Sequence, residues 1–289
     1  YGSGGGALLL SNATVALNRA DFGAGIDVEG TAAAAAVVLE QNTLILNNTA
    51  AQAGGGIRIA GNTRLYATEP QIWIGYNHAD SGDGGGINVV GPARADIGSP
   101  GYNSIGVVSS NTAQYGGAVS LYAPSGSGSA TIRVFSTDSN QPVQISGNSA
   151  SNAGGAFILW GNEHDCGNAY CPDTANVCLY DARVNDNIAP SGAAFHAGVS
   201  DGVDSEYVYF NPAGNCGPES PVSLGAVACA AGVACDEISD NTNEDGSGNP
   251  TSGSTVEMPA NGAHFYAERL HMRRNKGAHV FGSASPADD

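Results

Sequence analysis

A cluster of Gly and Ala residues recurs along the chain directly before a short apolar stretch, and in most copies an Asn stands a few residues earlier. The looser copies contain Gly23, Gly192, Gly262 and Gly277, and Gly4-Gly5-Gly6-Ala7 lacks the Asn. The clearest copies are Asn48…Gly54-Gly55-Gly56-Ile57, Asn77…Gly84-Gly85-Gly86-Ile87, Asn111…Gly116-Gly117-Ala118-Val119 and Asn148…Gly154-Gly155-Ala156-Phe157. Repetition at a nearly fixed period is typical of solenoids, so the chain is predicted to be a stack of repeats.

The period predicts the kind of stack. The last residues of the clusters at Gly25, Gly56, Gly86 and Ala118 are 31, 30 and 32 residues apart, and the next two spacings are 38. A strand with its turn takes roughly 8–10 residues, so one coil has room for three strands. No amphipathic stretch of helical length is present. We therefore predict one all-β domain over residues 1–289, a right-handed parallel β-helix with three strands per coil, because parallel crossovers are right-handed.

Residues after each cluster alternate in character, as in a strand with one buried face. We expect an interior column of the pairs Ala7/Leu9, Ile26/Val28, Ile57/Ile59, Ile87/Val89, Val119/Leu121 and Phe157/Leu159. The repeated Asn is expected at a turn, where its side-chain amide can bond the same Asn of neighbouring coils and satisfy buried backbone groups.

The six cysteines fall into two groups of three within polar segments: Cys166, Cys171 and Cys178, then Cys216, Cys229 and Cys235. An even count in such segments indicates disulfides and an oxidising compartment, whereas a zinc site with His164 is the alternative. Each group holds an odd number of cysteines. If all six cysteines form disulfides, at least one bond must therefore join the two groups. The expected inserts are about residues 161–176 and 201–254.

The net charge of −17 makes nucleic acids and anionic membrane surfaces poor partners. No apolar run approaches the ~18–20 residues of a membrane span, so no membrane insertion is expected.

The sequence offers little for catalysis. One outward column is expected to run Leu8, Asp27, Arg58, Asn88, Ser120, Ile158 and His196. It holds a surface ion pair and a lone His but no pair of carboxylates, so no catalytic residue is assigned. The acidic loops Asp201–Glu206 and Asn243–Asn249 match no calcium motif. Solvated loops are favoured over calcium sites, and no metal or cofactor is assigned.

The next outward column is apolar and aromatic. Val90, Tyr122 and Trp160, with the nearby Ile158, are expected to form a patch on the outside of the coil. Such a patch indicates either a partner or glycan site or a surface covered by the Cys-bearing inserts.

The pairing of an N-x-A turn with a G-G-[GA]-[IVF] strand start resembles the repeats of polymorphic outer-membrane proteins and related autotransporter-type passengers. It occurs at Asn48-Thr49-Ala50, Asn111-Thr112-Ala113 and Asn148-Ser149-Ala150, each with its cluster. The resemblance implies a parallel β-helix on a bacterial surface with a largely adhesive or structural role. We therefore expect a non-enzymatic extracellular rod or fibre subunit. A carbohydrate-active β-helix enzyme and a glycan-binding module are the alternatives.

The chain begins at Tyr1 inside a repeat, and the first copy leaves Ala7, Leu8, Leu9 and Leu10 without a cap. Solenoids protect their ends because a bare coil exposes strand edges and core. We expect this strand to be covered by another copy of the chain, end to end, or by further coils of a longer parent.

Overall fold

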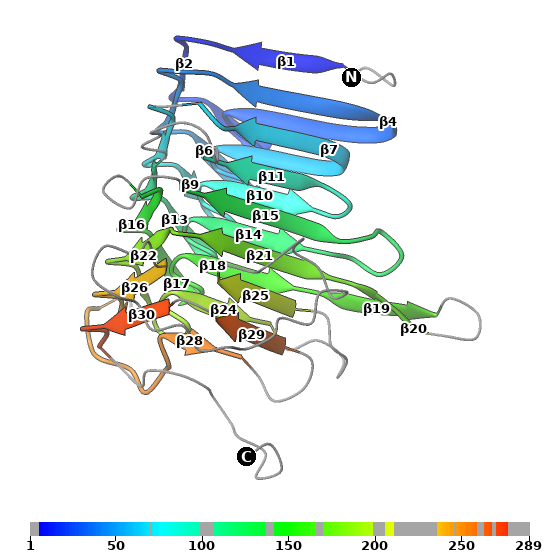
Figure 1. Ribbon diagram of the computed structural model, residues 1–289. Helices are drawn as coiled ribbons and strands as arrows, with labels where there is room; N and C mark the ends of the chain where they lie inside the picture. Colours follow the sequence, from blue (N-terminus) through cyan, green and yellow to red (C-terminus); the bar gives the residue numbers. More distant parts are fainter. Residues whose placement is uncertain are drawn as a thin grey trace.

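The computed structural model describes residues 6–69, 71–98, 107–136, 142–165, 170–198, 206–210, 236–245, 247–258, 263–267 and 270–276. These residues form strands and turns, and none of them forms a helix. Every pairing in the three large sheets is parallel, and the strands stack in layers from β1 to β30 (Figure 1). The predicted all-β, parallel architecture is confirmed and is consistent with a β-solenoid.

Two of the large sheets consist of short strands. The eight-stranded sheet contains, in order, β2 (Thr14–Ala16), β5 (Leu44–Leu46), β8 (Trp73–Gly75), β12 (Val107–Ser109), β16 (Gln144–Ser146), β22 (Arg183–Asn185), β26 (Asp236–Ser239) and β30 (Leu270–Arg273). The seven-stranded sheet contains β3 (Arg19–Phe22), β6 (Thr49–Ala53), β9 (His78–Ala79), β13 (Thr112–Tyr115), β17 (Ser149–Ala153), β23 (Ile188–Ala189) and β27 (Thr242–Asn243).

The thirteen-stranded sheet has two arms. The long strands β4 (Ile26–Leu39) and β7 (Ile57–Ala67) belong to both arms. The first arm continues through β10 (Ile87–Val90), β14 (Val119–Tyr122), β18 (Phe157–Trp160), β24 (Phe195–Ala197) and β28 (Val256–Glu257). The second arm contains β1 (Ala7–Leu10), β11 (Arg94–Ile97), β15 (Ala130–Phe135), β21 (Ala175–Tyr180), β25 (Glu206–Phe210) and β29 (Ala263–Ala267). Separately, β19 (Asn162–Asp165) and β20 (Tyr170–Asp173) pair as an antiparallel hairpin.

Within the described residues each repeat passes through the eight-stranded sheet, the seven-stranded sheet, the first arm and the second arm. From β8 to β29 each repeat contributes four such strand segments, whereas the repeats β2–β4 and β5–β7 contribute the predicted three, because one long strand there runs through both arms. In β7 the two arms are continuous, whereas Gly91-Pro92 separates β10 from β11. Proline has no N–H to donate to the ladder, so the strand ends there.

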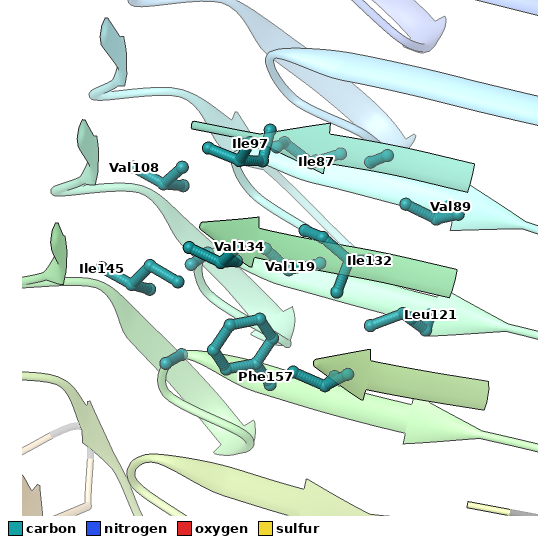
Figure 2. Close-up of a cluster of buried hydrophobic side chains, with 14 of the residues drawn as sticks. Ile87, Val89, Ile97, Val108, Val119, Leu121, Ile132, Val134, Ile145 and Phe157 are labelled. Carbon is teal, nitrogen blue, oxygen red and sulfur yellow. The ribbon is translucent and has the colours of Figure 1, made fainter. Parts of the chain in front are cut away.

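The first arm, the second arm and the eight-stranded sheet enclose the apolar core. Figure 2 shows side chains of the first arm (Val89, Leu121) and of the second arm (Ile132, Val134) in the space between the arms, with Ile145 of the eight-stranded sheet closing one side. All of these side chains are at most 1% exposed. The expected interior column is confirmed from Ile57/Ile59 to Phe157/Leu159, in parallel register. From β6 to β23 the seven-stranded sheet presents small inward residues: Ala50, Ala79, Ala113, Ala150 and Ala189.

The expected Asn ladder is present. Asn77 shows its pattern: its Nδ2 donates to Asn111 Oδ1 (3.1 Å) and to the Ile45 carbonyl (2.9 Å). Its Oδ1 accepts from the backbone N–H and Nδ2 of Asn48, both at 3.0 Å. The Asn-to-Asn bonds join Asn18, Asn48, Asn77, Asn111, Asn148, Asn187, Asn241 and Asn275.

The residue before each ladder Asn has a left-handed backbone, with φ of 56° at Tyr76 and 57° at Ser110. This conformation turns the chain between the eight- and seven-stranded sheets. At the next corner the first Gly of the cluster is left-handed, with φ of 66° at Gly84 and 63° at Gly116. A side chain is strained in that region, which explains why the first position of the clusters remains Gly.

Two expectations about individual segments are wrong. Ala7–Leu10 pairs with Ala36–Leu39 in the second arm, so it is not a copy of the corner cluster. The segment 201–254 is not one excursion, because β25, β26 and β27 lie inside it as ordinary strands. The insert expected at about 161–176 corresponds to the β19–β20 hairpin, and β21 begins at Ala175.

The last two copies are only 15 residues apart, too few for a coil, which predicts that one of them is a chance match on a different face. The copy at Gly262 fits this expectation, since β29 pairs with β25 in the second arm. The corner position of that repeat is held by Ser254-Thr255-Val256, where the Thr255 carbonyl accepts from the Ala194 N–H at 2.9 Å. Polar residues replace Gly and Ala there, and Asn241 supplies the ladder Asn.

Candidate functional site

The residue after each ladder Asn lies on the outside of the seven-stranded sheet. The Asn side chains point inward, and successive residues of a strand point to opposite faces. His78, Thr112, Ser149, Ile188 and Thr242 occupy this position on neighbouring strands, each in register with the next. They form a continuous column of outward side chains along the stack.

A groove with a volume of about 270 Å³ lies over this column. It crosses the four neighbouring strands β9, β13, β17 and β23, about 14 Å at the ~4.8 Å strand spacing, and reaches the residues that follow β27. The residues after β27 form part of its wall, held by a hydrogen bond from the Glu244 N–H to the Ala189 carbonyl (3.1 Å). Its lining consists of His78, Ala79, Asp80, Thr112, Ala113, Gln114, Ser149, Ala150, Ser151, Ile188, Glu244 and Asp245.

A carboxylate, an imidazole and a hydroxyl meet at one end of the groove. His78 Nε2 is 3.0 Å from Asp80 Oδ1, and His78 Nδ1 is 2.5 Å from Thr112 Oγ1. The His78 and Asp80 side chains are 46% and 57% exposed, so ligands in the groove can reach both. This arrangement can bind hydrogen-bonding groups and can also move a proton from the hydroxyl.

The groove is acidic. Three carboxylates line it, those of Asp80, Glu244 and Asp245, and its described lining contains no Lys or Arg. Asp245 accepts hydrogen bonds from the Asn249 side chain (3.0 Å) and from the Ser247 and Asn249 N–H groups (2.8 and 2.9 Å). These bonds lower the pKa of Asp245. The groove therefore suits neutral or cationic ligands rather than polyanions.

Asp245 lies in one of the two loops considered for calcium, and its oxygens are used in these bonds within the loop. In the described part of the chain, no three His, Cys, Asp or Glu side chains are grouped to hold a metal ion. The other loop, Asp201–Glu206, lies outside the described residues except for Glu206.

The outward column of the first arm has the predicted register from Asp27 to His196, and Arg58 Nη1 bonds Asp27 Oδ1 at 3.0 Å. Its middle members, Asn88, Ser120 and Ile158, are buried and do not lie on the surface as expected. His196, expected to be alone, has Glu257 beside it on β28. Ser191 Oγ lies 3.2 Å from His196 Nδ1 and donates to Glu257 Oε2. Burial lowers the pKa of His196, and the nearby Glu257 carboxylate opposes that effect.

The aromatic patch is only partly as expected. Val90, Tyr122 and Trp160 are in register on β10, β14 and β18, and Tyr122 is 41% exposed. Ile158, however, is fully buried, and Trp160 packs edge-on against Tyr115 with ring centroids 5.8 Å apart. The side chain of Tyr115 comes from the end of β13, at the adjacent corner, so the chain itself covers part of the patch.

Asp83 occupies the same corner one repeat earlier, in a bridge with Tyr115. Desolvation by burial raises its pKa to about 6. It lies directly before the left-handed Gly84, so a carboxyl group is held at a crowded corner.

Of the six cysteines, only Cys178 has a described side chain. It is fully buried on β21 and disulfide-bonded. Which cysteine it pairs with, like the pairing of Cys166, Cys171, Cys216, Cys229 and Cys235, depends on side chains outside the described part of the chain. The predicted bond between the two groups therefore stays a prediction.

Sequence reasoning missed the groove because it followed only the strands after the Gly clusters. The signal was present, since each groove column residue directly follows a ladder Asn. Among the described residues no helix has the length and apolar character of a membrane span. The chain matches no protein-family model, no curated protein and no solved structure.

Proposed function

We propose that this chain is a structural or adhesive rod, a right-handed parallel β-helix that binds polyhydroxylated ligands in the groove over its seven-stranded sheet. The observation that carries the proposal is the register of His78, Thr112 and Ser149 on three successive strands under one groove. Hydroxyl, imidazole and amide groups at strand spacing suit a neutral glycan chain that runs along the stack. Right-handedness is supported by the general rule for parallel crossovers.

Rigidity supports this role. A continuous Asn ladder ties each repeat to the next, and the core is continuous between them. A stack of this kind keeps its groove residues at fixed spacing, so little conformational entropy is lost when an extended ligand binds.

Binding to a panel of neutral and anionic polysaccharides, measured by calorimetry, tests the proposal. We expect binding of neutral chains and none of polyanions. Ser149→Trp, which fills the groove, should abolish binding, whereas Asn62→Trp on the exposed part of β7 should leave it unchanged. Absence of binding to every polysaccharide, or equal affinity of both variants, would contradict the proposal.

The proposal places the rod outside the cell, on a bacterial surface. Its support is the motif resemblance and the disulfide at Cys178, which suits an oxidising compartment. Localisation of the tagged protein in its native cells tests this, and a cytosolic signal would contradict it.

Self-association or continuation of the stack at β1 is part of the proposal. Within the described residues β1 pairs on one side only, with β4, and Leu8 and Leu9 are 39% and 58% exposed. We expect concentration-dependent oligomers in analytical ultracentrifugation that Leu9→Lys dissolves. A protein that stays monomeric at all concentrations would contradict end-to-end association of copies.

A carbohydrate-active enzyme is the second candidate. The observation that favours it is the contact of His78 with both Asp80 and Thr112 in the groove.

A further inference from the structure

The backbone fixes Asp80, His78 and Thr112 on one face. Thr112 is directly opposite His78 in the parallel pair β9–β13. Asp80 follows His78 by two residues, so both side chains leave the same side of the strand. All three line the groove.

The hydrogen bonds determine which ring nitrogen carries the proton. An ionised carboxylate only accepts hydrogen bonds, so Nε2 of His78 must be the N–H that faces Asp80 Oδ1 at 3.0 Å. In neutral imidazole Nδ1 then has a free lone pair and must accept, so the Thr112 hydroxyl donates to it. Asp80 thus holds His78 in the tautomer that a general base for Thr112 requires.

We propose that this cluster is a hydrolytic centre for carboxylic esters, with Thr112 as nucleophile and His78 as general base, oriented by Asp80. Thr112 Oγ1 forms a bond to the ester carbonyl carbon while its proton passes to His78 Nδ1. The C–O bond to the alcohol then breaks, and the alcohol leaves with that proton. Water, deprotonated by His78, attacks the acyl-Thr112 ester and releases the carboxylic acid, and the proton returns to Thr112.

Ester cleavage fits the groove better than cleavage of a glycosidic bond. The latter needs a carboxyl group that stays protonated near neutral pH to act as general acid. Asp83 and Asp96, whose pKa values are raised by burial, do not line the groove, whereas hydrogen bonds lower the pKa of Asp245, which does. Gln114, two residues after Thr112, also lines the groove, and its amide is the donor that we assign to the oxyanion.

The acidic lining indicates an uncharged substrate, an acyl ester of a polyhydroxylated compound. This substrate class rests on the proposed glycan-binding role of the groove. The chemical step does not, because a small activated ester needs no glycan contacts.

The test uses the whole chain with p-nitrophenyl acetate, and measures both nitrophenol release and acetylation of the Thr112 peptide by mass spectrometry. We expect Thr112→Ala and His78→Ala to lower the rate at least ~100-fold, the usual size of general-base effects. Thr112→Ser should keep activity and show that the site remains folded. Thr49→Ala is the matched control, because Thr49 is in register with His78 on the opposite neighbouring strand, and it should leave the rate unchanged.

Equal rates of ester cleavage in Thr112→Ala and Thr49→Ala, or acetylation found only at residues other than Thr112, would overturn the proposal. His78 and Asp80 would then be a surface ion pair without a catalytic role. Loss of ester cleavage in Thr112→Ala with glycan binding retained would support both proposals. If the parent chain cleaves the ester but binds no polysaccharide, the catalytic proposal is supported and the proposed glycan-binding function is refuted.

Discussion

Asn111 Nδ2 donates to Asn148 Oδ1 across 3.0 Å, and the backbone N–H of Asn111 donates to the same oxygen, also at 3.0 Å. The other Nδ2 hydrogen bonds the Ile74 carbonyl at 3.0 Å. Asp has no side-chain donor, and Gln is one methylene longer, so neither can repeat this pattern at the strand spacing. The ladder thus explains why Asn recurs at one position of each repeat.

Removing one member of the ladder should be costly. Asn111→Ala deletes two donated bonds and two accepted from Asn77, and it leaves buried backbone groups unpaired. At about 1 kcal/mol for each bond, we expect a loss of roughly 4 kcal/mol in the free energy of unfolding. Chemical denaturation measures it. Asn62→Ala, at an exposed position of β7, is the control and should change stability by less than ~0.5 kcal/mol.

A charge in the core should prevent folding. Ile87 is fully buried between Ile57 and Val119 on neighbouring strands. Ile87→Asp places an unpaired carboxylate there, so we expect circular dichroism to show an unfolded or aggregated chain. The matched variant Ile87→Val should fold and lose about 1 kcal/mol. A folded, monomeric Ile87→Asp protein would show that the interior column is not the core.

Asp83 should make stability depend on pH. Burial raises its pKa to about 6 in the folded chain, against 3.8 for the ordinary group. The folded state therefore holds this proton more tightly. Stability is fully present below pH 3.8 and is lost as the pH rises from there to about 6, by at most about 3 kcal/mol at ~1.4 kcal/mol per pKa unit.

The Asp83→Asn variant has no titrating carboxyl at this position, so it lacks this pH-dependent contribution to stability. The free energy of unfolding of the parent chain should fall relative to the variant between pH 4 and pH 7, in urea titrations at each pH. Parallel pH profiles for the two proteins would contradict burial of the Asp83 carboxyl.

The disulfide prediction concerns the two groups of three cysteines. We expect peptide mapping without reduction to find at least one bond between the group of Cys166, Cys171 and Cys178 and the group of Cys216, Cys229 and Cys235. Within the second group, Cys229–Cys235 is the expected local pair. Free thiols at all six positions would refute both the disulfides and the oxidising compartment.

Much of the fold follows from residues that repeat. The spacing of the Gly clusters predicted a parallel stack, the alternation after them predicted the core column of Ile57, Ile87, Val119 and Phe157, and the Asn before them predicted the ladder. Each of these features depends on a local rule that every coil obeys again. Sequence reasoning failed where a repeat departs from the rule, as at Thr255, or where a motif occurs out of phase, as at Gly6-Ala7.

The sequence by itself determined the parallel β architecture, the buried aliphatic column and the Asn ladder, because strand alternation and turn chemistry act within one coil. Tertiary structure alone decided what lies side by side across coils. Thr112 follows His78 by 34 residues, and Glu257 follows Ser191 by 66, yet both pairs are in contact. The loops differ in length from coil to coil, so the sequence separation of two residues does not show whether they are in contact. Parallel pairing keeps the strands in register whatever the loop lengths, and this register decides which residues meet.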